Sequence, residues 1–369
     1  MNESMSSAVV LHLALGLVLS LLLGACGGDA PERTEAATAQ AEADTACTFT
    51  NPIADGADPW VVRRDGWYYS VESSEDGLSV YRSKTLTDLE QNEVRVWDAP
   101  DDGWNQGHVW APELHFVDGR WYIYYAAGED GPPYIHQRSG VLRSAGTDPQ
   151  GEYEEMGRLY TGDDLSAQTE NIWAIDVTVG RIDGQLYAVW SGWEENQSDD
   201  ATPQHLYIAE MENPWTMGSD RVRISSPTAS WEQGTELDIN EGPTMVKRNG
   251  EVFILYSTRE SWLPAYRMGQ LRLAGATADP LSPDNWTKSG PVFQGTDRVH
   301  GTGHASFTTS PDGSEDWIVY HSKKSTEPGW DRFIRTQPFT WGDDGNPQFG
   351  QPVSPDSAIA VPSGQNGCS

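Results

Sequence analysis

The chain has 369 residues, with 55 acidic against 24 basic side chains and a formal net charge of −31. Its hydrophobic content of 37%, with 16 tryptophans, is enough for a substantial core and excludes a wholly disordered protein. So negative a surface repels nucleic acid and other anionic polymers, so we expect neutral or cationic partners and no nucleic acid. Charge alone identifies no substrate.

The N-terminal part is expected to lie outside the folded domain. Residues 9–23 form an apolar run that is short for a membrane span and placed like the core of a signal peptide. The run ends in Leu-Gly-Ala before Cys26, which resembles a bacterial lipoprotein processing site, although the first residues contain Glu3 and no Lys or Arg. We therefore predict a signal peptide over residues 1–25, lipidation of Cys26 and a disordered tether over residues 26–46. The protein would be exported, at the cell surface or in the periplasm, and attached to the membrane only through this anchor.

Two further cysteines, Cys47 and Cys368, stand at the two ends of the predicted folded domain, residues 47–369. In an oxidising compartment such a pair suggests a disulfide, with two free thiols as the alternative. Neither C-x-x-C nor a zinc-type cysteine cluster occurs.

From residue 47 onward, short apolar runs alternate with turns rich in Gly, Pro, Asn and Asp. The same unit recurs five times: a strand, a turn that ends in glycine, and a second apolar strand. The turn glycines are Gly66, Gly119, Gly184, Gly250 and Gly313. Further strands are predicted at residues 61–62, 67–71, 78–82, 122–126, 185–190 and 205–210. The units repeat every 52 to 66 residues or so, which with four strands per unit predicts an all-β fold, a five-bladed β-propeller.

The heads of the five units carry the candidate functional residues. Counting back eight or nine positions from each turn glycine leads to Asp58, Trp110 or Ala111, Asp176, Glu241 and His304. The first strand of each propeller blade lines the central channel, so these heads should converge at one end of it. The alternative is that these ionisable residues share one position in the repeat by chance, because the chain contains so many Asp and Glu residues. Three carboxylates in one pocket suit glycoside hydrolysis, in which one carboxylic acid protonates the leaving oxygen and a carboxylate activates water or attacks directly. The two need opposite protonation states at one pH.

At these residues the sequence resembles glycoside hydrolase family 43, five-bladed propellers that act on arabinose- and xylose-containing polysaccharides. The resemblance extends over nearly all of residues 51–353 and rests on five motifs in order. They are Gly56-Ala-Asp-Pro-Trp60, Trp110-Ala-Pro-Glu113, Ala174-Ile-Asp176, Asn240-Glu-Gly-Pro243 and Gly303-His-Ala-Ser306.

The resemblance implies a role for each matching residue. Asp58 would be the general base, Glu241 the general acid and Asp176 the residue that orients the acid and modulates its pKa, in a reaction that inverts the anomeric carbon. His304 matches a position that helps to hold a water-coordinated ion, commonly calcium, on the propeller axis; a neutral histidine hydrogen-bonded in the channel is the alternative. The chemistry itself would require no cofactor.

Other residues are expected to bind substrate or to support the fold. Trp60 and Trp110 flank the proposed site and would either stack on a furanose ring or pack between blades. Arg332, rather than Arg335, is expected to face the channel, because side chains alternate along a strand, and to hold a substrate hydroxyl or pair with the acid. Structural roles are expected for Glu113, His115 and His321.

Four further segments look most like the exo-acting α-L-arabinofuranosidase branch of the family. They are residues 190–193, 224–227, 311–321 and 337–341. We therefore expect a monomer that releases terminal α-L-arabinofuranosyl residues from plant cell-wall arabinan or arabino-oligosaccharides. The long segments 130–138 and 194–204 could block one end of the site, as an exo enzyme requires. A β-xylosidase, an endo-arabinanase and a non-catalytic carbohydrate-binding surface lipoprotein remain alternatives.

Overall fold

The structure is a computed structural model that describes residues 47–74 and 76–365. Apart from one 3₁₀ turn, η1 (Pro283–Asn285), all the regular elements in these ranges are β-strands. No helix in the described part is long and apolar enough to cross a membrane. The predicted signal peptide, the tether, Cys26 and Cys368 lie outside the described residues.

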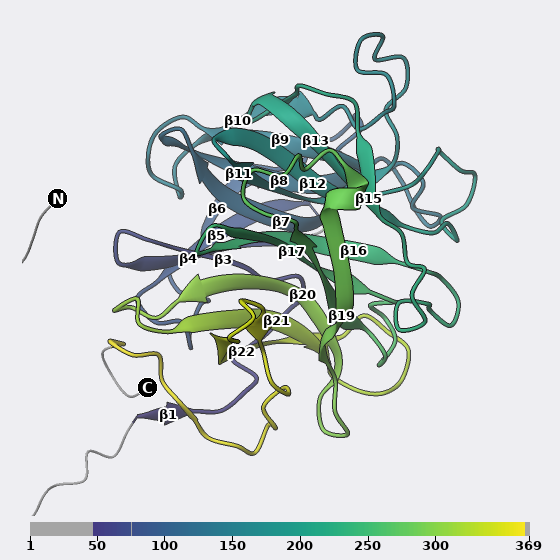
Figure 1. Cartoon of the computed structure of the whole chain (residues 1–369). Coiled ribbons are helices and arrows are strands. Elements are labelled where there is room, and N and C mark those ends of the chain that lie inside the picture. Colours follow the sequence, from purple (N-terminus) through teal and green to yellow (C-terminus); the bar gives the residue numbers. More distant parts are fainter. Residues whose placement is uncertain (1–46, 75, 366–369) are drawn as a thin grey trace, which may run out of the picture. The chain divides into compact units, whose positions relative to one another are not determined.

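Five antiparallel sheets form the blades of a propeller, which confirms the predicted fold (Figure 1). Blade 1 consists of β3 (Trp60–Arg64), β4 (Trp67–Ser74), β5 (Gly77–Ser83) and β6 (Val94–Asp98). Blade 2 consists of β7 (Gly107–Val117), β8 (Arg120–Gly128), β9 (Arg138–Ser144) and β10 (Tyr153–Arg158). Blade 3 consists of β11 (Ala174–Ile182), β12 (Gln185–Gly192) and β13 (His205–Asn213), with β14 (Thr216–Met217) and β15 (Val222–Ser225) both paired to β13.

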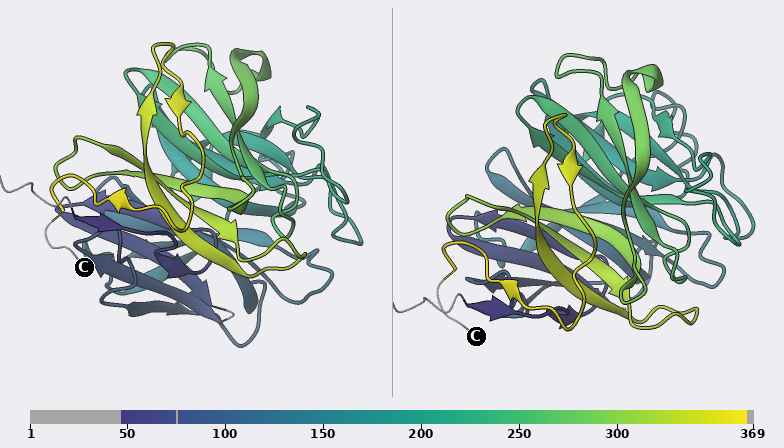
Figure 2. Two further views of the ribbon diagram at one scale, coloured as in Figure 1. Left: turned by 90° about the horizontal axis from the view of Figure 1, so that it is seen from below. Right: turned by 60° about the horizontal axis from the view of Figure 1, so that its bottom comes forward.

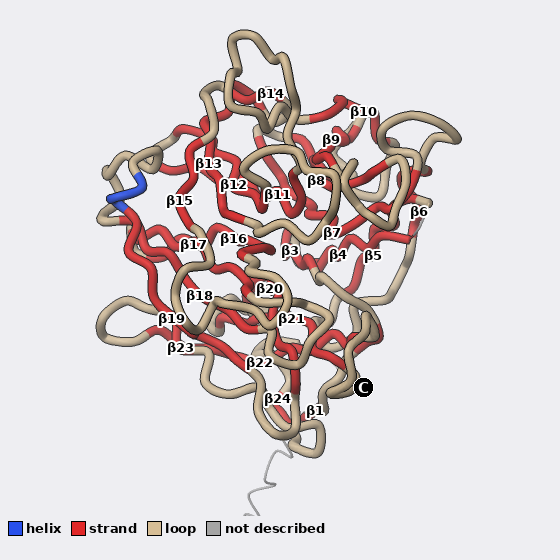
Figure 3. Tube along the Cα trace, turned by 90° about the vertical axis from the view of Figure 1, so that its right-hand side faces the viewer, coloured by secondary structure: helices blue, strands red, loops and turns tan. Residues whose placement is uncertain are grey.

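Blades 4 and 5 complete the ring. Blade 4 consists of β16 (Asn240–Arg248), β17 (Glu251–Thr258), β18 (Arg267–Leu273) and β19 (Trp286–Gln294). Blade 5 consists of β20 (His300–Thr309), β21 (Asp316–Lys323), β22 (Arg332–Trp341) and β2 (Ala54–Asp55), with β23 (Pro347–Gln348) also paired to β22. In the view of Figure 3, the first strand of each blade lies near the centre of the ring. These strands are β3, β7, β11, β16 and β20.

The two ends of the described chain meet in and beside blade 5, which closes the ring. Strand β2 pairs with β22, and β1 (Thr48–Phe49) pairs with β24 (Ile359–Ala360), so purple and yellow strands lie together in Figure 2. The buried side chain of Asn51 exchanges hydrogen bonds with the backbone of Thr336 at 2.8 and 3.0 Å. Cys47 is disulfide-bonded. This closure by an N-terminal strand was not foreseen from the sequence.

The core lies between neighbouring blades rather than along the axis. Alternate side chains of each strand point to opposite faces of its sheet, so each blade offers apolar residues to both neighbours. Val71 and Leu78 of blade 1, for example, pack in one cluster with Trp121 and Ile123 of blade 2. Burial of each such side chain stabilises the fold by roughly 1.5–3 kcal/mol. The axis is thereby left free for polar residues.

Candidate active site

The inner strands share a local irregularity that shapes the site. Each of β7, β11, β16 and β20 shifts its register against the second strand close to its start. One residue at each shift, and the corresponding residue before β3, has a positive φ. These residues are Asp58 (49°), Ala111 (39°), Asp176 (56°), Gly242 (53°) and His304 (46°). Left-handed φ is unfavourable for most L-residues, so its recurrence in all five blades marks a conserved geometry of the ring rather than an accident of one loop.

This geometry corrects one step of the sequence interpretation. The positive-φ residue stands eight positions before the turn glycine in blades 1 to 4 and nine in blade 5. In blade 4 this residue is Gly242, so Glu241 comes one residue earlier than the head position assigned to it. Glu241 is instead equivalent to Trp110, since each opens the register shift of its own strand. Counting from the turn could not detect this difference, because the count of nine was correct only for blade 5.

Gly242 is required at its position for a second reason. A Cβ atom on this residue would stand 3.1 Å from two ring atoms of His304. The glycine therefore permits the close approach of blades 4 and 5 beside the site, and its backbone N–H donates a 2.9 Å hydrogen bond to Asp176 Oδ2. The backbone of blade 4 thus orients a carboxylate of blade 3.

Three nitrogen atoms from blade 5 lie close to the carboxyl group of Asp58. Its Oδ1 atom lies 3.0 Å from Nδ1 of His321, 3.2 Å from Nδ1 of His304 and 3.3 Å from Nη1 of Arg332. Burial raises the pKa of Asp58, but the positive charge of Arg332 and the two imidazoles outweigh it and hold the pKa well below its usual range. Asp58 is therefore a carboxylate at any pH near neutrality and can accept a proton.

Glu241 and Asp176 differ from Asp58, because the pKa of each is raised. Glu241 is 8% exposed, and burial raises its pKa to about 7 although the Tyr266 hydroxyl donates a 2.8 Å hydrogen bond to Oε1. Burial together with the charges of Glu241 and Asp58 raises the pKa of Asp176 well above its usual value. The pair Asp176–Glu241 therefore retains a proton near neutral pH, while Asp58 does not.

Tyr266, which the sequence did not single out, offers a test of this assignment. Its hydroxyl stabilises the ionised form of Glu241, so Tyr266→Phe should raise the pKa of Glu241. If Glu241 acts as the acid, the alkaline limb of kcat/KM should move to higher pH than in the wild type, with a loss of less than about tenfold at the optimum. A pH–rate series measures this limb. An unchanged or lowered limb would contradict the role of Glu241.

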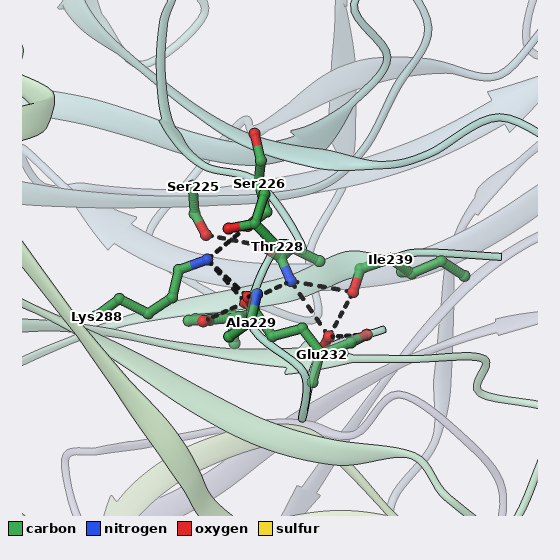
Figure 4. A network of polar contacts seen from close by, with 10 residues as sticks. Ser225, Ser226, Thr228, Ala229, Glu232, Ile239 and Lys288 are labelled. Carbon is green, nitrogen blue, oxygen red and sulfur yellow. Dashed lines mark hydrogen bonds and ion pairs between the residues drawn. The ribbon is translucent and has the colours of Figure 1, made fainter. Parts of the chain in front are cut away.

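The polar network around Ser225, Glu232 and Lys288 is shown in Figure 4. It anchors the buried residue Asn240, which precedes Glu241. Its side chain donates to Glu232 Oε1 at 3.1 Å and accepts from the Ser225 hydroxyl at 2.7 Å, while its carbonyl accepts from Ser191 at 3.0 Å. Glu232 is fully buried and is paired with Lys288, whose Nζ lies 2.9 Å from both carboxylate oxygens. These bonds fix the backbone that carries Glu241.

Removal of the cation from this network should destabilise the domain. Lys288→Met would leave the carboxylate of Glu232 buried without its partner, which we expect to lower the free energy of unfolding by roughly 3 kcal/mol. Urea unfolding measures the loss. Arg298→Met, which removes an exposed ion pair with Asp356, is the matched control and should cost less than about 1 kcal/mol. Equal losses in the two variants would contradict the structural role of the network.

The predicted sugar-contacting residues have different surroundings. Trp110 is half-buried, with its ring 4.9 Å from that of Tyr134, and stands in the register position equivalent to Glu241. Trp60 donates its indole N–H to the carbonyl of Leu114 at 2.7 Å and lies 4.6 Å from the ring of His115, so its ring packs across blades 1 and 2. Substrate contact by either tryptophan stays a prediction.

The two arginines differ as strand alternation predicts, but the partner of Arg332 was not foreseen. Arg332 contacts Asp58, where the sequence suggested a bond to the acid or to substrate. Arg335 is buried and donates to the Ser322 hydroxyl at 2.7 Å. His321, expected only to pack, is fully buried but directly contacts Asp58. His321 comes from the second strand of blade 5, and no local sequence signal marks such a contact across blades.

Glu113 and His115 form a separate pair in the channel. Their side chains approach to 2.7 Å, and both are largely buried. Burial raises the pKa of Glu113 well above its usual value and lowers that of His115 to about 3, so both are neutral near pH 7. A neutral hydrogen-bonded pair agrees with the structural roles expected for both residues.

The ion implied at His304 has limited support among the residues present. Within residues 47–74 and 76–365, no three His, Cys, Asp or Glu side chains are grouped so that they could hold a metal directly. His304 Nδ1 is directed at Asp58, and burial lowers the pKa of His304, so its imidazole is neutral. Direct ligation by several side chains does not fit, and an ion held through water stays a prediction.

An ionised Asp58 and a proton-retaining Glu241 and Asp176, at one end of a five-bladed propeller, have the features of a carboxylate-dependent glycoside hydrolase site. Comparison with known proteins agrees: residues 49–347 match the model of glycosyl hydrolases family 43. The chain belongs to this family.

Relatives of known activity are similar over most of the chain. An extracellular exo-α-(1→5)-L-arabinofuranosidase of Streptomyces avermitilis is 36% identical over 86% of this chain, and one of Streptomyces chartreusis is 34% identical over 76%. The matched regions cover 66% and 84% of those proteins, so this chain spans just under two thirds of the first. The crystal structure of an α-L-arabinofuranosidase from Lactobacillus brevis aligns with a TM-score of 0.74 at 34% identity, covering 84% of this chain and 98% of that one.

Proposed function

We propose that the protein is an exported exo-acting α-L-arabinofuranosidase that releases terminal residues from arabinan or arabino-oligosaccharides with inversion. The observation that carries the proposal is the contrast between the surroundings of two carboxyl groups in a family 43 propeller. Asp58 is held ionised by Arg332 and two histidines, whereas Glu241 has a pKa of about 7. The similarity to the arabinofuranosidases supports arabinose rather than xylose as the sugar.

The geometry suggests how each group would act. Glu241 donates its proton to the glycosidic oxygen as the bond from this oxygen to the anomeric carbon breaks. Asp58 takes a proton from a water molecule, whose oxygen forms the new bond to the anomeric carbon from the opposite face. The reaction leaves Asp58 protonated and Glu241 ionised, and exchange with solvent restores both. Asp176 accepts the N–H of Gly242, the residue after the acid, and the charge of Glu241 raises the pKa of Asp176, which supports a role for Asp176 in orienting the acid.

Two long loops support exo action. Residues 129–137 connect β8 to β9 and residues 193–204 connect β12 to β13, at the end of the propeller where the inner strands start. The second loop bonds to the first and to the strand that follows it: Asp200 accepts from the Tyr134 N–H at 3.0 Å, and Asn196 accepts from Arg138, the first residue of β9, at 3.2 Å. Loops tied together across blades 2 and 3 would close one side of the site, as removal of a terminal sugar requires.

Export and anchoring complete the proposal. The two Streptomyces relatives are named as extracellular enzymes, which supports export. Lipidation at Cys26 rests on the sequence alone, and so does the choice of Cys368 as the partner of Cys47, which is disulfide-bonded. Mass spectrometry of the mature chain, with and without reduction, tests both: an unmodified Cys26 would remove the anchor, and two free thiols would remove the disulfide.

The activity is tested by incubating the protein with α-1,5-arabino-oligosaccharides and xylo-oligosaccharides side by side. We expect arabinose from the start, with substrate chains shortened one unit at a time, and initial release of the β-anomer by NMR. Release of xylose would indicate a β-xylosidase instead, and internal cuts would indicate an endo enzyme. Initial release of the α-anomer would contradict an inverting mechanism. Binding without product would favour the carbohydrate-binding alternative.

A further inference from the structure

An exposed tryptophan stands beside the candidate active site. Trp330 is 61% exposed and, with Val94, is one of only two large hydrophobic side chains in the described residues that are classed as exposed. It lies in the turn of residues 324–331 between β21 and β22. A single exposed apolar side chain needs no explanation, but exposed apolar residues that gather beside a pocket mark a candidate for ligand contact. No part of the mechanism above uses this residue.

Trp330 packs against a second tryptophan. The rings of Trp330 and Trp262 have centroids 5.2 Å apart and are inclined at 46°. The Gly329 N–H donates a 3.0 Å hydrogen bond to the Trp262 carbonyl, so the two turns are also joined through their backbones. Trp262 belongs to the segment of residues 259–266 between β17 and β18. The pair therefore bridges blades 4 and 5.

Both turns lie at the end of the propeller that carries the site. The last residues of β17 and β21, Thr258 and Lys323, pair with the first residues of β16 and β20. Arg332 links the tryptophans to the chemistry, because its guanidinium carbon lies 5.5 Å from the Trp330 ring centroid and its Nη1 atom 3.3 Å from Asp58 Oδ1. The exposed ring is thus one side chain away from the proposed base.

The segment that carries Trp262 also holds the proposed acid. Tyr266 and Ser261, both within residues 259–266, hydrogen-bond the carboxyl group of Glu241. A general acid stands next to the leaving oxygen, so the sugar beyond the cleaved bond must pass on its side of the pocket. Trp262 is therefore placed at the leaving-group side of the pocket, and Trp330 extends the pair outward from it along the rim between blades 4 and 5.

We propose that Trp262 and Trp330 form a platform that stacks on the arabinofuranosyl units beyond the cleaved bond. This inference rests on the proposed function and adds a binding site for the leaving part of the chain. Aromatic faces suit the apolar C–H faces of a sugar, and a neutral ligand suits so acidic a protein. The platform would favour oligosaccharides over substrates that carry no sugar on the leaving side.

The test compares methyl α-L-arabinofuranoside, which has no leaving-group sugar, with α-1,5-arabinotriose. We expect the wild type to prefer the trisaccharide in kcat/KM, and Trp330→Ala to reduce this preference roughly threefold to tenfold. Val94→Ala, on the outer strand of blade 1, is the matched control and should retain the wild-type ratio. Equal losses of kcat/KM on both substrates would mean that Trp330 acts only through Arg332, and unchanged kcat/KM on both would mean that it binds no sugar; either would overturn the platform.

Direct binding separates this inference from the proposed function. Calorimetry with arabinotriose and the slow variant Glu241→Gln, with and without Trp330→Ala, should give a weaker Kd by a similar factor. If the wild type releases no arabinose from either substrate, the proposed function has failed. The binding result then still decides on the platform, because equal affinity, or none, in the two variants would overturn it.

Discussion

Replacement of Glu241 by glutamine is expected to lower kcat on arabino-oligosaccharides by about 10²- to 10⁴-fold. A sugar hydroxyl is a poor leaving group, and glutamine has a similar shape but no proton to donate. In the wild type, Glu241 has a pKa of about 7 and must be protonated to act, so activity is present below pH 7 and is lost as the pH rises through this value. The alkaline limb of the pH profile should therefore disappear in the variant.

The choice of leaving group makes this prediction specific to the acid. A dinitrophenyl arabinofuranoside needs no proton to depart, so Glu241→Gln should retain much more activity on it than on arabinobiose. Glu113→Gln is the matched control: Glu113 is also a buried carboxyl group with a raised pKa, but it is bonded to His115. We expect this control to change kcat less than tenfold on both substrates. Near-wild-type turnover of arabinobiose by the Glu241 variant would exclude it as the acid.

The repeat pattern predicted the architecture because the hairpin signals are local. A turn glycine between two apolar runs marks a unit wherever it occurs, and five such units account for all five blades. The closing strand β2 escaped prediction, because it has only two residues and pairs with β22 almost 280 residues further along the chain. Nothing in a two-residue segment indicates such a partner.

Candidate site residues could be found from the sequence where an ionisable residue stands at the shared position of its unit. Residues that reach the site through contacts between blades could not. Asp58, Asp176 and His304 occupy the shared positive-φ position, but the offset of Glu241 by one residue depends on a backbone irregularity that has no signature in a single sequence. Tyr266 and His321 reach the carboxylates from a loop and from a second strand. Their contacts exist only once the blades have packed.

Two of the four segments that suggested an arabinofuranosidase bond to the residue before Glu241. Ser191 lies in the motif of residues 190–193 and Ser225 in that of residues 224–227, and both donate to Asn240. Such serines fix the backbone next to Glu241 and do not reach a sugar through these bonds. These two segments therefore contribute to the site through the backbone that carries Glu241.

Asp58→Asn should lower kcat by at least about 10³-fold on every arabinofuranoside, whatever its leaving group. Asparagine has nearly the same shape but cannot accept a proton, and it tolerates the positive φ of 49° at this position better than alanine would. The measurement is kcat on arabinobiose and on the dinitrophenyl arabinofuranoside. Circular dichroism and thermal unfolding check that the variant is folded.

Comparison of Glu241→Gln with Asp58→Asn tests which residue is the acid and which is the base. Loss of the acid should be offset by a better leaving group, whereas loss of the base should not, because water must be activated in either case. Arg332, His304 and His321 hold the pKa of Asp58 low, so the wild type should keep its activity as the pH falls to about 4, where an ordinary aspartate would begin to be protonated. A leaving-group-dependent rescue of Asp58→Asn, or an acid limb near pH 6 in the wild type, would assign the base to another residue.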